Sequence, residues 1–231
     1  MHSEDLTFGR VIIEALASLE SSSRAAVLIR HSIRGPITPE NPDVSLTEEG
    51  RAHARIFGGS LPWNGSLLVR TSSMRRCVET AEEILRGYRE SHPDSTAALL
   101  QSGKSLAALL HSDENKSQIR ELVKLMERRA PEPDSEWDIP SERVDSALAA
   151  ARRTVRDLRA LLGGVPEGSL CLFVDHDFHI MILGEALFGG YLTKKQWIDY
   201  LDGLVLTVGP EDELIAVRGS QKVVVSSSDG K

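Results

Sequence analysis

Three short polar clusters in the sequence combine residue types that could bind or transfer a phosphoryl group. They are residues 30–34 (Arg-His-Ser-Ile-Arg), 71–76 (Thr-Ser-Ser-Met-Arg-Arg) and 175–177 (Asp-His-Asp). In the first cluster His31 stands between Arg30 and Arg34. Positive neighbours disfavour the imidazolium, so a neutral, nucleophilic ring nitrogen is expected. The two guanidinium groups offer forked donors that match phosphate oxygens, unless this is simply a strand end where charges meet solvent.

The other two clusters each have a chemical and a structural interpretation. Arg76 falls in the first turn of a predicted helix, where exposed N–H groups attract an anion and an arginine adds charge; otherwise it is a solvated surface side chain. His176 can donate a hydrogen bond to a phosphoryl oxygen, and Asp177 can protonate a leaving oxygen. Asp177 also precedes a helical run, so the alternative is that it caps that helix.

Short aliphatic runs and helical spacings predict the elements that carry these clusters. Strands are predicted at residues 25–30, 66–70, 97–100, 169–174, 204–208, 214–218 and 222–226. Helices are predicted within residues 1–22, from Thr47 onward with Thr47 as N-cap, and at residues 74–89, 119–126, 144–162 and 180–188. Residues 131–140 are rich in proline and acidic side chains, which is typical of a surface loop.

This alternation of strands and helices predicts an α/β three-layer sandwich, with a mostly parallel central sheet and helices on both faces. We expect one domain over residues 1–231, with a small cap inserted at about residues 94–140. Ligands of such sheets bind at the carboxyl ends of the strands, and each polar cluster follows a strand. The three clusters are therefore expected to meet at one site.

Bulk composition narrows the possible partners. The chain has 231 residues, of which 34 are acidic and 27 basic, and its net charge of −7 argues against nucleic-acid binding. Its two cysteines, Cys77 and Cys171, are too few for a disulfide framework and favour a reducing compartment. No apolar run approaches the ~20 residues that span a bilayer. Residues 1–22 lack the basic start and continuous apolar core of a signal peptide, so we expect a cytoplasmic protein that binds no membrane.

Taken in chain order, the motifs resemble those of the histidine phosphatase superfamily, which has the phosphoglycerate mutase-like fold. The matching residues are Arg30-His31 at a strand end, Leu46-Thr47-Glu48-Glu49-Gly50 at a helix start, Ser72 with Arg76, Glu79-Thr80-Ala81, and His176. The spacing of Arg34 and Pro36 after His31, together with the pair His176-Asp177, looks more like the acid-phosphatase branch than the phosphoglycerate-mutase branch. The resemblance covers nearly the whole chain.

The resemblance implies a role for each matching residue. His31 would be the nucleophile that becomes a phosphohistidine. Asp177 would be the general acid for the leaving alcohol and then the base that activates water. The phosphoryl group would be bound, and its transition-state charge stabilised, by Arg30, Arg34, Arg76 and His176. No metal or other cofactor is implied, because these arginines and histidines supply the positive field.

Two features depart from the family pattern. Ser32 follows the nucleophile where the family usually has glycine; either φ is negative there and serine is tolerated, or its hydroxyl joins the pocket. The cap is also short for an acid phosphatase, which leaves the substrate class open. A cap glutamate could replace Asp177 as the acid, the candidates being Glu114, Glu121 and Glu136.

The sequence therefore favours a metal-independent phosphatase that hydrolyses small phosphomonoesters through a phosphohistidine on His31. One alternative is a phosphoglycerate mutase-like phosphotransferase on the same fold, which would retain the phosphoenzyme. The other is a non-catalytic module that keeps the phosphate pocket and recognises phosphorylated partners. Sugar phosphates, nucleotides, phosphopeptides and small acids are all compatible substrates, and the sequence sets no oligomeric state.

Overall fold

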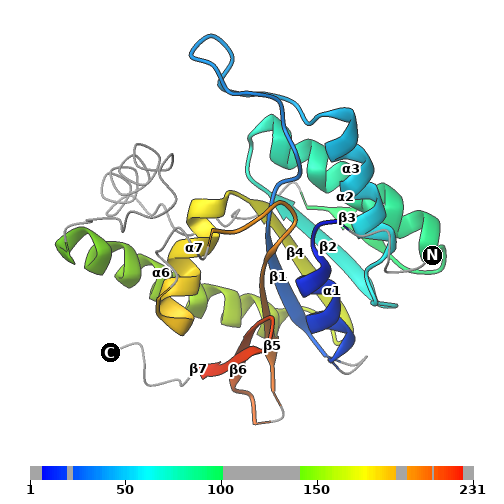
Figure 1. Cartoon of the computed structure of the whole chain (residues 1–231). Coiled ribbons are helices and arrows are strands. Elements are labelled where there is room, and N and C mark those ends of the chain that lie inside the picture. The colour runs from blue at the N-terminus through cyan, green and yellow to red at the C-terminus, as the bar shows by residue number, and fades with distance from the viewer. Residues whose placement is uncertain (1–6, 20–22, 101–140, 191–196, 210, 226–231) are drawn as a thin grey trace.

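The computed structural model describes residues 7–19, 23–100, 141–190, 197–209 and 211–225. Its centre is a seven-stranded sheet in the order β3-β2-β4-β1-β5-β6-β7. The strands are β1 Ala25–Arg30, β2 Ser66–Thr71, β3 Ala97–Leu99, β4 Ser169–Asp175, β5 Gly203–Val208, β6 Leu214–Arg218 and β7 Gln221–Val225. The helices are α1 Arg10–Ala17, α2 Glu48–Gly59, α3 Arg75–Ser91, α6 Ser141–Gly164 and α7 Asp177–Phe188 (Figure 1).

The sheet is parallel only in its core. Strands β3, β2, β4 and β1 pair in parallel, whereas β5 runs antiparallel to β1 and continues into the antiparallel strands β6 and β7. The expectation of a mostly parallel sheet is therefore right for the four strands joined by helical crossovers and wrong for the last three. Those three are linked by short turns, and a short turn can only join antiparallel neighbours.

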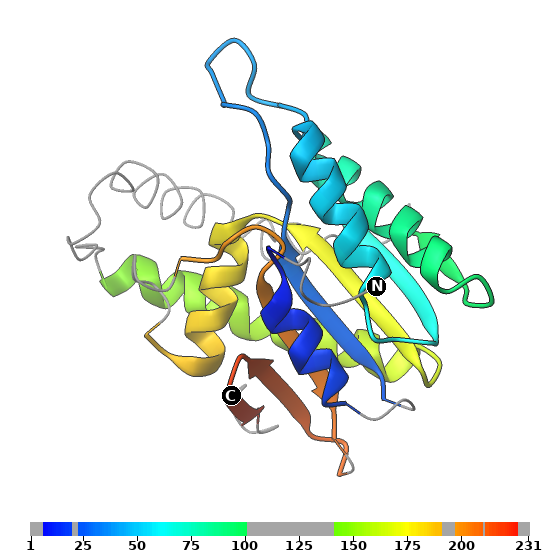
Figure 2. The same ribbon diagram turned by 45° about the vertical axis from the view of Figure 1, so that its right-hand side comes forward.

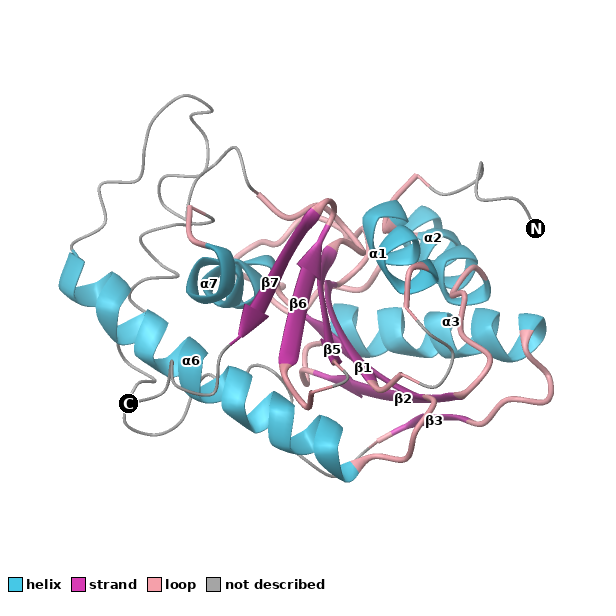
Figure 3. Ribbon diagram, turned by 90° about the horizontal axis from the view of Figure 1, so that it is seen from below, coloured by secondary structure: helices cyan, strands magenta, loops and turns pink. Residues whose placement is uncertain are grey.

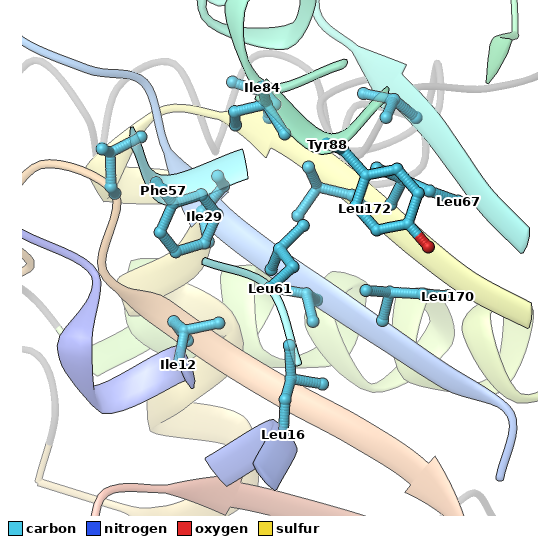
Figure 4. Packing of buried hydrophobic residues seen from close by; sticks show 14 of the residues in the cluster. Ile12, Leu16, Ile29, Phe57, Leu61, Leu67, Ile84, Tyr88, Leu170 and Leu172 are labelled. Carbon is cyan, nitrogen blue, oxygen red and sulfur yellow. The ribbon is translucent and has the colours of Figure 1, made fainter. Parts of the chain in front are cut away.

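Helices cover both faces of the sheet, which gives the expected three layers (Figure 3). Successive side chains of β1 alternate between the two layers: Val27 and Ile29 pack with α1, α2 and α3, and Ala26 and Leu28 pack with α6 and α7. Figure 4 shows the first of these cores, where Phe57 of α2 and Tyr88 of α3 lie over the strands. Both cores are closed, so polar chemistry is confined to the strand ends.

Local sequence signals explain where the helices next to the site begin. Thr47 is the N-cap of α2, as predicted, and its hydroxyl accepts a hydrogen bond from the Gly50 N–H at 3.0 Å. The start of α3 has no cap from its own N-cap residue; instead Asp43 accepts from the Arg75 N–H at 2.7 Å. Asp43 belongs to the loop between β1 and α2, which projects from one end of the molecule (Figure 2). That loop is thus tied to α3.

Most predicted elements are present within one to three residues of their expected ends, including the strands β1, β5, β6 and β7. The amphipathic helix expected within residues 1–22 is α1. The predicted helix at 119–126, the loop at 131–140 and most of the cap at 94–140 lie outside the described residues. In the part of the chain that the structure describes, no helix combines the length and apolarity needed to cross a membrane.

Candidate active site

Strand register brings the three polar clusters to one edge of the sheet. Strands β2, β4 and β1 are neighbours, with Arg30 paired to Asp175 and Thr71 paired to Val174. All three are parallel, so their carboxyl ends meet where β1 leads to His31, β2 to Ser72 and β4 to His176. The rings of His31 and His176 lie edge to face with centroids 5.7 Å apart. The predicted convergence of the clusters is therefore present.

His31 is buried and holds a defined tautomer. Its ring Nδ1 lies 2.8 Å from the carbonyl oxygen of Ser32. A carbonyl can only accept, so Nδ1 carries the proton and Nε2 carries the lone pair. Burial lowers the pKa of His31 to about 2, and the positive field of Arg30, His176 and Arg76 adds to that lowering. The ring is neutral over the physiological pH range, with a nucleophilic nitrogen at Nε2.

His176 is the N-cap residue of α7 and takes the opposite tautomer. Its Nδ1 lies 3.4 Å from Nη2 of Arg76, a group that only donates, so Nδ1 accepts and Nε2 carries the proton. Nε2 lies 3.3 Å from the hydroxyl of Ser72. Burial lowers the pKa of His176 to about 4, with Asp175 opposing the shift and His179 and Arg76 adding to it. His176 is thus a neutral donor at the same site.

The three predicted arginines leave buried N–H donors without partners among the described residues. These are Nε of Arg30, Nε of Arg34, and both Nε and Nη1 of Arg76, whose residue is only 9% exposed. Burial lowers the pKa of Arg34, and the nearby charges of Arg76 and Arg30 add to that effect. Clustered guanidinium groups with unmatched donors need an anion that has several oxygens. A phosphoryl group fits that requirement.

Asp177, the first residue of α7, points its carboxylate into the arginine cluster. Oδ2 lies 3.1 Å from Nη2 of Arg30, and Oδ1 accepts from the Phe178 N–H at 2.9 Å. Its side chain is 11% exposed, so this ion pair lies at the floor of the site rather than on an open surface. Asp177 is not the N-cap of α7, because His176 holds that position. The cap glutamates Glu114, Glu121 and Glu136 lie outside the described residues.

Asp175 and His179 form a buried pair beneath His176. The Asp175 carboxylate accepts from the His176 backbone N–H at 2.9 Å and contacts Nδ1 of His179 at 2.7 Å. His179 lies in the first turn of α7, and its ring centroid is 5.7 Å from that of His176. The pair fixes the turn from which His176 enters the site. Within the described ranges, no three His, Cys, Asp or Glu residues are grouped to hold a metal ion.

The structure shows how Ser32 is accommodated at the position where the family usually has glycine. Its φ is not positive, because only Leu201 and Asp212 among the described non-glycine residues have positive φ. Its hydroxyl donates to the Gly50 carbonyl at 2.7 Å, and its N–H donates to the hydroxyl of Thr80 at 3.0 Å. The hydroxyl therefore ties the loop that follows His31 to α2 instead of entering the pocket.

The Leu-Thr-Glu-Glu-Gly motif has a packing explanation. A Cβ at Gly50 would lie 2.1 Å from the carbonyl oxygen of Ile33, so only glycine lets the loop after His31 lie this close to α2. Thr47 donates its backbone N–H to the same carbonyl at 3.0 Å. Glu79 closes the arrangement, accepting from the Leu46 N–H at 2.8 Å. The motif therefore holds the loop that follows His31 against α2 and α3.

Tyr200 lies beside the site but belongs to no motif recognised in the sequence. The ring centroid of Tyr200 lies 4.3 Å from the Arg30 guanidinium carbon and 6.1 Å from the centroid of the His31 ring. Tyr200 follows no predicted strand and matches none of the motifs. Its proximity results from the segment before β5, which crosses the end of β1.

The chain matches a known protein family over most of its length. A protein-family model described as "Histidine phosphatase superfamily (branch 1)" matches residues 27–214. No sequence match to a curated protein is found. The matching model belongs to branch 1, so the expected affiliation with the acid-phosphatase branch is not confirmed.

Solved structures similar to this chain include phosphatases. Phosphoserine phosphatase from Entamoeba histolytica in complex with 3-phosphoglyceric acid is 15% identical, with 90% of this chain and 99% of that chain covered and a TM-score of 0.45. The mycobacterial glucosyl-3-phosphoglycerate phosphatase is 19% identical, with coverage of 80% and 89% and a TM-score of 0.40. At such low identity and TM-score, neither structure indicates a substrate for this chain.

Proposed function

This chain belongs to the histidine phosphatase superfamily, and from that premise we propose that it hydrolyses phosphomonoesters without a metal, through a phosphohistidine on His31. One observation carries the proposal. The lone-pair nitrogen of a buried, neutral imidazole lies among guanidinium groups whose buried N–H donors have no partner among the described residues. That combination supplies a nucleophile and a binding site for the group it attacks.

The first chemical step transfers the phosphoryl group to the enzyme. Nε2 of His31 attacks phosphorus as the bond from phosphorus to the ester oxygen breaks, and the leaving oxygen takes a proton from Asp177. Arg30, Arg34 and Arg76 stabilise the charge on the three remaining oxygens, and Nε2–H of His176 donates to one of them. The carbonyl of Ser32 holds the Nδ1 proton and stabilises the positive charge that develops on the ring.

The second step releases phosphate. Asp177, now a carboxylate, accepts a proton from water as the water oxygen attacks phosphorus and the bond between phosphorus and Nε2 breaks. This step regenerates the neutral imidazole of His31 and releases inorganic phosphate. The carboxylate that accepts this proton lies 3.1 Å from Nη2 of Arg30. No other reactant than water is consumed.

The nucleophile is tested by replacing His31 with alanine and assaying a panel of aryl, sugar, nucleotide and amino-acid phosphates. We expect the wild-type chain to turn over at least the aryl phosphate and His31→Ala to lose that turnover. Acid-labile, base-stable phosphate should be trapped transiently on the wild-type protein when turnover is quenched, and not on His31→Ala. His92→Ala, which removes a histidine at the distant C-terminal end of α3, is the matched control and should keep turnover.

The same panel separates the alternatives. A phosphotransferase would hold a stable phosphoenzyme and move phosphate between small acids faster than to water. A phosphate-recognising module would bind phosphate and turn over nothing. Wild-type turnover in His31→Ala would refute the phosphohistidine mechanism.

The role of Asp177 is tested with leaving groups of different basicity. In Asp177→Asn, turnover of an alkyl phosphate should fall by about 10²–10⁴-fold, because a poor leaving group needs the proton. Turnover of p-nitrophenyl phosphate should fall much less, because its leaving group needs little protonation. Equal losses for both substrates, or an unchanged pH profile, would remove Asp177 from this role and direct attention to Glu114, Glu121 and Glu136. The cytoplasmic location and a small phosphorylated substrate remain predictions alongside this mechanism.

A further inference from the structure

The segment before β5 wraps around Arg30. Arg30 donates its backbone N–H to the Asp202 carbonyl at 3.0 Å and accepts from the Leu201 N–H at 3.1 Å. Its Nη1 donates to the Ile198 carbonyl at 2.8 Å, although the two residues are 168 positions apart. Both the backbone and the guanidinium group of Arg30 are therefore held by one turn, residues 198–202.

This turn contains a strained residue that the surrounding structure holds in place. Leu201 has φ of 57°, a conformation that side-chain-bearing residues rarely adopt, yet its side chain is fully buried. On one side, Gly9 packs so closely that a Cβ there would lie 3.0 Å from the Leu201 carbonyl oxygen. On the other side, a Cβ at Gly203 would lie 1.7 Å from the Leu28 carbonyl oxygen. Strain of this kind persists where the surroundings over-determine the backbone, and it is concentrated at functional sites.

The residue that this turn presents is Tyr200. Its ring lies under the Arg30 guanidinium at 4.3 Å and is supported from the side by Phe8, whose ring centroid is 5.7 Å away in an edge-to-face arrangement. Asp177 forms an ion pair with the Arg30 guanidinium, with Oδ2 lying 3.1 Å from Nη2. Together, the aromatic face, one carbonyl and one carboxylate leave the Arg30 guanidinium a single orientation, with Nε unpartnered among the described residues.

We propose that Tyr200 is a positioning residue that holds the Arg30 guanidinium in the orientation that receives the phosphoryl group. The inference rests on the proposed function, because it assigns Arg30 to phosphate binding. It adds a residue from the last third of the chain that acts through Arg30 and does not itself react. Cation–π contact strengthens as the cation is shielded from water, and the Arg30 side chain is only 12% exposed.

The test compares Tyr200→Phe, which keeps the ring, with Tyr200→Leu, which removes it. We expect Tyr200→Phe to stay within about twofold of wild type. Tyr200→Leu should weaken the binding of inorganic phosphate and raise KM for p-nitrophenyl phosphate by roughly 3- to 30-fold, the range that corresponds to a lost desolvated cation–π contact. Calorimetry with inorganic phosphate measures binding without turnover, and thermal melting of each variant shows that it is folded.

A double-mutant cycle then distinguishes positioning from general damage. In an Arg30→Gln background, Tyr200→Leu should cause little further loss of phosphate affinity, because the cation that the ring positions is already gone. Equal losses in both backgrounds, or unchanged phosphate affinity in Tyr200→Leu, would overturn the inference. A wild-type chain that binds phosphate, loses affinity on Tyr200→Leu and yet hydrolyses nothing would refute the proposed function and leave this inference standing. A wild-type chain that binds no phosphate would refute both.

Discussion

Burial of the two facing imidazoles, His31 and His176, sets how the protein responds to acid. Their pKa values in the fold, about 2 and about 4, lie below the ordinary value of 6.5. Below pH 6.5 the unfolded chain therefore binds protons that the folded chain does not. The stability that comes from keeping these rings neutral is complete above pH 6.5 and is lost progressively as the pH falls, down to about pH 4 for His176 and about pH 2 for His31.

We predict that the free energy of unfolding falls by up to about 1.4 kcal/mol per pH unit for each of these histidines between pH 6.5 and pH 4.5. Urea unfolding at a series of pH values measures the slope. His31→Gln, which cannot titrate, should have a slope shallower by about the contribution of one histidine. Parallel pH dependences for the wild type and His31→Gln would show that His31 is not buried neutral in the fold.

At the scale of elements, the link between β1 and α2 determines the position of His31. The loop after His31 reaches α2 through the Ser32 hydroxyl, the Ile33 carbonyl and the close approach of Gly50. This link, rather than β1 itself, fixes the carbonyl that selects the His31 tautomer. A change at the start of α2 should therefore affect catalysis although it touches no substrate.

Gly50→Ala should destabilise the fold by about 1–3 kcal/mol, because the added methyl group overlaps the Ile33 carbonyl and must displace the loop. Turnover should fall as well, since the displaced loop carries His31. Thermal unfolding and steady-state kinetics on an aryl phosphate measure the two effects. Gly163→Ala in α6, where nothing lies within 4 Å of an added Cβ, is the control and should be neutral or stabilise by up to about 1 kcal/mol. Matching behaviour of the two variants would contradict this account of Gly50.

For the whole molecule, the distribution of charge matters more than its sum. The net charge is −7, yet arginines and histidines converge at the carboxyl ends of β1, β2 and β4, where His31 is only 3% exposed. An acidic exterior repels an extended polyanion, while the focused positive potential inside attracts a small phosphoryl group.

We predict that inorganic phosphate inhibits turnover competitively, whereas a single-stranded oligonucleotide without terminal phosphates, at the same total phosphate concentration, does not. Inhibition constants measured at low and at physiological salt check this, because attraction between exposed charges would weaken with added salt. Competitive inhibition by the oligonucleotide would show that the basic residues form an open surface rather than a recessed site.

The sequence by itself determined the elements and the chemical character of the site. Apolar runs bounded by polar residues placed β1 at its observed ends, and the side chain of Thr47 capped α2 as predicted, because both signals depend on neighbours close in the chain. Three polar clusters after strands were enough to predict that Arg30, His31, Arg76 and His176 meet, because parallel strands share a carboxyl edge.

Only the tertiary structure decided how those residues are held. The tautomer of His31, the hydroxyl bond of Ser32, the pair of Asp175 with His179 and the stacking of Tyr200 on Arg30 each depend on side-chain geometry at the sheet edge. The position of β5 beside β1, where the sheet changes from parallel to antiparallel pairing, is likewise set by the tertiary structure. Residue types indicate what chemistry is possible, but contacts between segments as distant as residues 30 and 200 arise only when the chain is packed.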